Sequence, residues 1–238
     1  LVSNLIAVTI AFGLLFLLDE KPLFAVNITT WHIKAVPYFI LLGILAGFNS
    51  VYLTRCVLFF KSQFSKINTH YYKILLGSAV LSLSLFIFPQ LYGEGYHSIK
   101  TIFGSSTEIP LTLTLSLTFF GLLVLKPIVT SITLASGGDG GVFAPSLFIG
   151  AFLGLLVASI LNTFFNIGVI TINFMIIGMA AVLSASIHAP FTALFLVCGL
   201  TNDYTLFIPL LAVSLISKYT AKMIYPFTVY SYSSSIAK

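Results

Sequence analysis

The stretch at residues 140–145, with the sequence GGVFAP, combines residue types that could bind a small anion. Glycines let the backbone turn sharply and approach a ligand, and a new apolar helix is predicted to start at about Val142. The first amides of a helix lack an intrahelical acceptor, and with the positive end of the helix dipole they favour an anion. The same spacing is also typical of a glycine hinge between two packed helices, so both interpretations stand.

Tyr230 is a second candidate donor, because it lies near the end of the last apolar segment and shortly after Pro226. Its phenol hydroxyl could donate a hydrogen bond to an ion. A tyrosine at the end of an apolar segment is also typical of an anchor between apolar and polar surroundings. The sequence leaves both roles open.

Two charged residues lie close to this stretch in the chain. Asp139 directly precedes the second glycine pair and is expected to be a turn or N-cap residue, or else a gate whose charge competes with an anion. Lys126 lies inside an apolar segment, where a base is costly and therefore a candidate functional residue. The alternative for Lys126 is that its long side chain snorkels towards the cytoplasm.

The sequence has no arrangement typical of an enzyme or of a metal centre. It contains no nucleotide-binding loop, zinc-ligand spacing or Ser/His/Asp set, and its histidines are separated from plausible co-ligands: His32, His70, His97 and His188. Cys56 and Cys198 lie in apolar stretches and are interpreted as core residues. We predict no enzyme activity and no cofactor, and we expect His188 to cap or pack near a helix start rather than to sense protons.

The composition predicts that lipid surrounds most of this protein. Of 238 residues, 58% are hydrophobic and only 7% are charged, which is too few to cover the surface of a soluble domain. The formal net charge of +5 does not indicate nucleic-acid binding, because the bases lie between long apolar runs. A soluble globular protein is therefore excluded.

The hydrophobic runs predict an all-α membrane protein, a multi-pass bundle of tilted, partly broken and half-length helices. Runs near full crossing length are predicted at residues 1–18, 37–60, 72–89, 111–134 and 142–165. The segment at residues 93–104 is too short to cross and predicts a re-entrant or half-length helix, and further segments follow at residues 172–183, 189–200 and 206–223, several of them again shorter than a full crossing. Irregular backbone at membrane depth requires protein or a water-filled cavity to satisfy its polar groups, so the broken helices indicate a transport path.

Small residues and bases refine this arrangement. Gly43, Gly47 and Asn49, together with the small-residue run at 178–190, predict close helix packing. The positive-inside rule places the loop bounded by Arg55 and Lys73, and the C-terminus, in the cytoplasm. The acids predicted on the other side are Asp19, Glu20, Glu94 and Glu108.

The run from residue 136 to 151 resembles the Gly-x-Phe-x-Pro signature of the CLC family of chloride channels and chloride/proton antiporters. Residues 178–190, 201–204 and 230–231 are similar to further family segments, in the same order and at similar spacing. The resemblance covers essentially the whole chain. It is similar to the second half of the bacterial CLC membrane domain, one half of an inverted-repeat pair plus flanking helices.

This resemblance implies a site and an activity. The backbone amides of Val142 and Phe143 and the hydroxyl of Tyr230 would hold a chloride ion, in a loop that includes Gly140, Gly141 and Pro145. The protein would move chloride, as a channel or in exchange for protons, as a homodimer with one pore per subunit. It would lie in the cell membrane, the inner membrane of a bacterium, and need no cofactor.

Some family features do not occur in this sequence. The family's Gly-Ser-Gly-x-Pro loop, its gating Gly-Arg-Glu-Gly-Pro motif and the inner glutamate of antiporters belong to the first half of its domain. We therefore expect residues 1–238 to be a single transmembrane domain fragment whose sequence fits a channel and an antiporter equally. Gly199 stands where many relatives carry a glutamate. The alternatives are another broken-helix secondary transporter and a membrane assembly fragment without transport activity.

Overall fold

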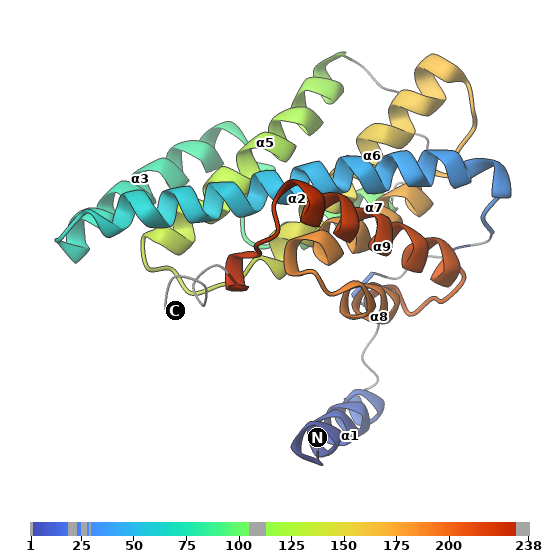
Figure 1. The fold of residues 1–238 in the computed structure, drawn as a ribbon, viewed down its shortest axis with the longest axis horizontal. Helices are drawn as coiled ribbons and strands as arrows, with labels where there is room; N and C mark the ends of the chain where they lie inside the picture. Colours follow the sequence, from blue (N-terminus) through green and yellow to red (C-terminus); the bar gives the residue numbers. More distant parts are fainter. Residues whose placement is uncertain (1, 19–22, 25–27, 29, 105–112, 232–238) are drawn as a thin grey trace.

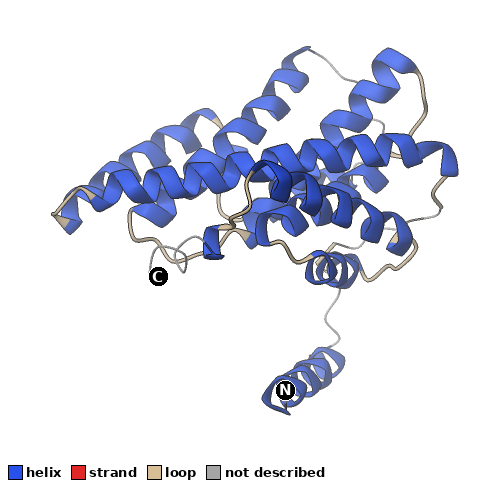
Figure 2. Cartoon of the chain, in the orientation of Figure 1, coloured by secondary structure: helices blue, strands red, loops and turns tan. Residues whose placement is uncertain are grey.

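The computed structural model describes residues 2–18, 23, 24, 28, 30–104 and 113–231 (Figure 1). Within these residues the chain forms helices joined by loops, without a strand (Figure 2). The α-helices are α1 (Val2–Leu18), α2 (Val36–Ser65), α3 (His70–Ile87), α4 (Tyr96–Gly104), α5 (Leu113–Ala135), α6 (Phe143–Phe165), α7 (Thr171–Ile187), α8 (Pro190–Thr201) and α9 (Phe207–Ile224). Two short 3₁₀ turns precede α2 and α4, namely η1 (Ile33–Ala35) and η2 (Pro89–Leu91).

Helix lengths follow the predicted mixture of full and partial crossings. Among the described residues, five helices are long and apolar enough to cross a membrane. In chain order they are α2 with its preceding turn, α3, the described part of α5, α6 and α9. The helices α7 and α8 are apolar but shorter, and α1, predicted as a crossing, is 17 residues long. The all-α prediction is confirmed.

The bundle is organised around the long helix α2 and the pair α6 and α7. Figure 1 shows α2 running along the length of the molecule beside α7 and α9, while α1 lies apart from the bundle. A Cβ atom placed on Gly43 would lie 3.0 Å from Val213, and one on Gly47 would lie 2.8 Å from Thr220. Only glycine allows α2 and α9 to approach this closely, as the small residues predicted.

The pair α6 and α7 forms the most extensive helix contact and supplies most of the core. A Cβ atom on Gly150 would clash with the carbonyl of Gly178, and one on Gly154 would clash with the carbonyl of Phe174. The two backbones therefore touch, which excludes side chains at these crossings. This contact confirms the packing predicted for the small-residue run at 178–190 and fixes the direction of α6.

Helix ends in the second half of the chain use left-handed residues. Asn166, His188 and Asn202 have φ values of 50°, 56° and 51° and end α6, α7 and α8. His188 lies near a helix start, as expected, two residues before α8 begins, and it caps the end of α7, while Ala189 is the N-cap of α8. Proline at the next position cannot continue the preceding helix, which explains the break.

The C-terminal half of α2 lies beside the end of α9. The Arg55 guanidinium carbon is 5.4 Å from the centroid of the Tyr225 ring. Arg55 and the segment leading to Tyr230 are therefore on the same side of the bundle. Large apolar side chains are exposed along α1, α2 and α3, which agrees with a surface facing lipid.

Candidate ion site

The turn between α5 and α6 is built by glycines. Gly137 has a φ of +98°, a conformation that residues with a side chain rarely adopt. The next amide, of Gly138, donates back to the carbonyl of Thr133 at 3.0 Å. These residues reverse the chain within a few positions, so α6 begins inside the bundle rather than at its edge.

The start of α6 agrees with the sequence prediction to one residue. Val142 is the N-cap and Phe143 the first helical residue. The Val142 carbonyl accepts hydrogen bonds from the Ser146 amide at 3.0 Å and from the Ser146 hydroxyl at 2.5 Å. The amides of Val142 and Phe143 have no acceptor within the helix, and none is found elsewhere among the described residues. They are available to a ligand.

Tyr230 lies against this turn although it is distant in sequence. A Cβ atom placed on Gly141 would be 3.3 Å from the Tyr230 hydroxyl oxygen. The hydroxyl therefore lies close to the chain just before α6, where a side chain larger than that of glycine would crowd it. Tyr230 is 51% exposed and Phe143 is 39% exposed, whereas the Val142 side chain is buried. The described residues leave this site open on one side.

The segment that carries Tyr230 is held by a local hydrogen-bond pair. The Thr228 amide donates to the Ser231 hydroxyl at 2.8 Å, and the Ser231 amide donates to the Thr228 hydroxyl at 3.0 Å. This reciprocal arrangement is that of a capped helical turn. Val229 is buried between the two, so the backbone on both sides of Tyr230 is fixed.

A cavity of about 360 Å³ adjoins the glycine turn. Its lining includes Asp139, Gly140, Gly141 and Pro145 from the turn and the start of α6, together with two charged residues from other parts of the chain, Glu94 and Lys126. All three residues of the predicted ion-site loop, Gly140, Gly141 and Pro145, therefore line the same cavity. The cavity brings together the charged residues that the sequence could only treat separately.

Lys126 is buried in this cavity wall and is only 3% exposed. Its ammonium donates to the carbonyls of Leu91 and Gly93 at 3.1 and 2.8 Å, and it lies 4.9 Å from the centroid of the Phe148 ring. Snorkelling was therefore the wrong interpretation. The carbonyl dipoles and the ring compensate the charge, while the positive field remains beside the start of α6.

Asp139 does not cap α6, because the helix starts later and its N-cap, Val142, makes no side-chain cap hydrogen bond. The N-cap interpretation was wrong. Asp139 is exposed, lies in the glycine turn and lines the cavity. Its position is compatible with the other interpretation, a charge at the approach to the site.

A buried serine cluster beneath the turn was missed by the sequence reasoning. The Ser146 and Ser186 hydroxyls are 3.0 Å apart, and those of Ser50 and Ser186 are 3.2 Å apart. The three come from α6, α7 and α2, so they join the start of α6 to both neighbours. The available signal was the presence of serines inside strongly apolar helices, where hydroxyls need partners.

Comparison with known proteins identifies the family. The profile of the family described as voltage gated chloride channel matches residues 1–222. The chain therefore belongs to the voltage-gated chloride channel family, the CLC family, and the resemblance is confirmed. Members of this family are channels and transporters rather than enzymes. Tyr230 lies beyond the matched residues.

The chain is similar to the curated voltage-gated ClC-type chloride channel ClcB of Escherichia coli strains SMS-3-5 and K12. Each is 29% identical over 160 residues, which cover 67% of this chain and 37% of the relative. Two solved structures share the fold. A slow cyanobacterial Cl⁻/H⁺ antiporter has a TM-score of 0.76 at 25% identity over 92% of this chain and 51% of that one.

The second structure is a CLC-type fluoride/proton antiporter, with a TM-score of 0.67 at 20% identity over 89% of this chain and 49% of that one. The likeness at this level concerns the fold alone. The chain spans about half the length of the solved structures that it matches and little more than a third of the curated relatives.

Proposed function

We propose that this chain supplies one side of a chloride site in a protein that moves chloride across the cell membrane. The anion is held by the backbone amides of Val142 and Phe143 and by the Tyr230 hydroxyl. The observation that carries this proposal is the closeness of the Tyr230 hydroxyl to Gly141, just before α6, where a Cβ atom would lie 3.3 Å from the hydroxyl oxygen. The phenol and the two amides therefore belong to the same turn.

The donors suit an ion that must leave again. Amides and a hydroxyl carry partial charges, which replace part of the hydration shell without holding the ion as tightly as a direct ammonium contact would. Lys126 lines the cavity that adjoins the glycine turn, yet its ammonium donates to the carbonyls of Leu91 and Gly93. It contributes a positive field rather than a ligand. Channel and proton-coupled exchange are both compatible with this arrangement.

The hydroxyl is tested by chloride titration calorimetry on the full-length protein. Tyr230→Phe removes one donor to a charged group, so chloride affinity should fall by on the order of 1 to 3 kcal/mol. Tyr204→Phe is the matched control, because Tyr204 is an equally exposed tyrosine, at 58%, between α8 and α9. An unchanged affinity in Tyr230→Phe would show that the hydroxyl serves as an anchor.

We further propose that residues 1–238 form one half of a CLC-type membrane domain, whose other half closes the site, and that two such domains pair with one pore each. The exposure of Phe143 and Tyr230 supports this, since dehydrating an anion requires donors on all sides. The chain covers 51% of one solved relative.

Liposome chloride efflux tests this second proposal. Residues 1–238 alone should give no selective flux, whereas the full-length protein should. Co-expression of the chain with the remainder should restore flux. Robust chloride-selective flux from the chain alone would refute the need for a second half, and inactivity of the full-length protein would favour an assembly role without transport.

A further inference from the structure

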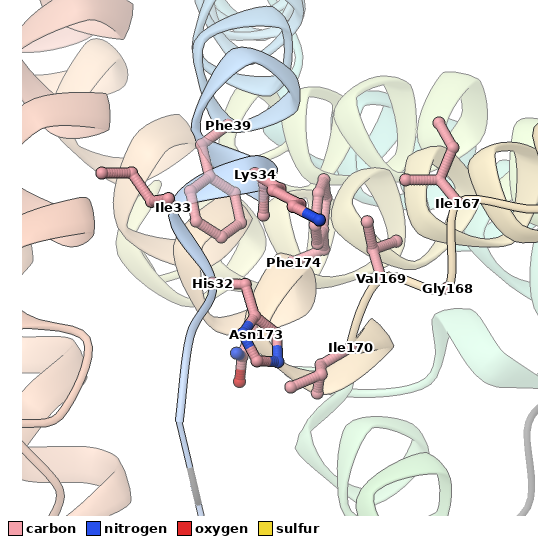
Figure 3. A pocket seen from close by; sticks show the side chains of 11 residues that line it. His32, Ile33, Lys34, Phe39, Ile167, Gly168, Val169, Ile170, Asn173 and Phe174 are labelled. Atoms are coloured by element: carbon pink, nitrogen blue, oxygen red, sulfur yellow. The ribbon is translucent and has the colours of Figure 1, made fainter.

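A second cavity of about 360 Å³ lies at the opposite end of α6, away from the glycine turn. Figure 3 shows it between the segment that leads into α2 and the loop that joins α6 to α7. Its polar lining consists of His32, Lys34 and Asn173, and the remaining lining is glycine or apolar. The proposed chloride site does not use any of these residues.

The walls of this cavity are held in place by side-chain hydrogen bonds. The Asn162 side chain donates to the Val169 carbonyl at 2.9 Å and accepts from the Val169 amide at 2.7 Å. The Asn173 side chain donates to the Thr30 carbonyl at 2.9 Å, which ties the segment before α2 to α7. The cavity is therefore formed before any ligand enters.

The described lining of the cavity contains two basic residues, Lys34 and His32, and no acidic residue. Lys34 supplies a positive charge, and His32 supplies an imidazole that can donate a hydrogen bond. In Figure 3 the Lys34 side chain extends with its ammonium towards the α6–α7 loop, while His32 and Asn173 lie at the other edge. The rings of Phe39 and Phe174 lie on either side of the Lys34 side chain, above His32 and Asn173 in this view. Such a surface suits a negatively charged group attached to an apolar chain.

The position of the cavity along the helices indicates which kind of molecule carries the negatively charged group. The apolar span containing α2 begins at Ile33, α6 ends at Phe165 and α7 begins at Thr171. The cavity thus lies where the hydrocarbon core gives way to headgroups. Large apolar side chains around the cavity are exposed: the exposed fraction is 80% for Ile33, 70% for Phe164 and 66% for Phe165. The chain's single tryptophan, Trp31, is adjacent in sequence, as is common at this level.

We propose that this cavity binds the phosphate headgroup of an anionic membrane lipid. Lys34 and His32 contact the phosphate, and the acyl chains lie along the exposed apolar residues at the ends of α2 and α6. A bare halide would gain little here, because the lining between the two bases is apolar. The bound lipid bridges the start of α2 to the α6–α7 loop and does not depend on the proposed chloride site.

Native mass spectrometry of the full-length protein tests this proposal. The probes are dioleoyl-phosphatidylglycerol and dioleoyl-phosphatidylcholine, whose acyl chains are identical. The wild type should retain the anionic lipid preferentially, and the double variant Lys34→Ala/His32→Ala should lose about fivefold in preference per removed charge. The matched control is Lys66→Ala/His97→Ala, since both residues are exposed and lie outside the cavity. It should behave as the wild type.

A second variant tests whether lipid binding needs the open shape of the cavity as well as its charge. Ile170→Trp fills the cavity mouth without changing its charge, and should displace the lipid from protein that elutes normally in size-exclusion chromatography. Equal lipid retention in the double variant and the wild type would overturn the proposal, as would equal loss in the control. Competition by inorganic phosphate at the affinity of the lipid would show that a free anion is bound instead. Protein residues filling the cavity in the full-length structure would also overturn it.

Discussion

The two ends of α6 each adjoin a cavity of about 360 Å³, yet they present different polar groups. At the start, the cavity adjoins the glycine turn that leads to the amides of Val142 and Phe143, while its base, Lys126, is buried and bound to carbonyls. At the far end, the polar groups include Lys34 and His32, which are both exposed.

In our two proposals, the difference lets one helix serve two kinds of anion. Partial charges hold an ion weakly enough for it to pass, and a buried base can add a field without binding the ion directly. An exposed lysine at headgroup level instead favours a large, tethered anion. Both arrangements need a rigid core between the two ends of α6.

Breaking the core should have the largest effect. Gly154→Val places side-chain atoms against the Phe174 carbonyl, where α6 and α7 touch. Because backbone cannot yield as a side chain does, we expect a loss above the usual 1–3 kcal/mol for overpacking, with little folded protein. Thermal unfolding and size-exclusion chromatography measure this. Gly199→Val is the control, because a Cβ atom at Gly199 meets nothing within 4 Å. Similar stability of the two variants would contradict the described crossing.

The sequence predicted these helices well because hydrophobic length and glycine breaks are local signals. The start of α6 could be predicted because the glycine run ends the preceding helix and an apolar segment follows it directly. The contact of Tyr230 with Gly141 has no local signal, since it depends on how α9 and the following turn fold back. Family resemblance, rather than spacing, pointed to that residue.

Two errors have the same physical origin. Asp139 has a good N-cap side chain, but the glycines after it delay the helix, so local preference was overridden by the turn. Snorkelling of Lys126 assumed that its charge needed water, whereas the carbonyls of Leu91 and Gly93 accept its hydrogen bonds inside the protein. Carbonyl acceptors in a distant loop leave no pattern in the sequence.

Neutralising Lys126 should affect only the start of α6. Lys126→Met leaves the buried Leu91 carbonyl without a donor, which costs about 1–3 kcal/mol, frees the partly buried Gly93 carbonyl, and removes the positive field beside the proposed site. Chloride affinity and liposome flux should both fall, while anionic lipid retention should not. Lys66→Met, at an exposed lysine, is the control. If Lys126→Met lost stability but kept its chloride affinity, the base would be purely structural.

Removing the serine bridge should have the smallest effect. Ser186→Ala deletes the hydroxyl that joins Ser146 to Ser50, at a cost of about 0.5–1.5 kcal/mol. The control, Ser78→Ala, removes an exposed hydroxyl bonded only to the Leu75 carbonyl. Thermal unfolding of both variants compares them, and an equal shift would mean that the cluster does not join the helices.

Anomalous diffraction from crystals of the full-length protein grown in bromide tests the chloride site most directly. Bromide replaces chloride in a site of amides and hydroxyls and can be located without reference to any protein atom. Our account predicts a peak within hydrogen-bonding distance of the amides of Val142 and Phe143 and of the Tyr230 hydroxyl. Strong peaks confined to other regions, with none at the start of α6, would contradict it.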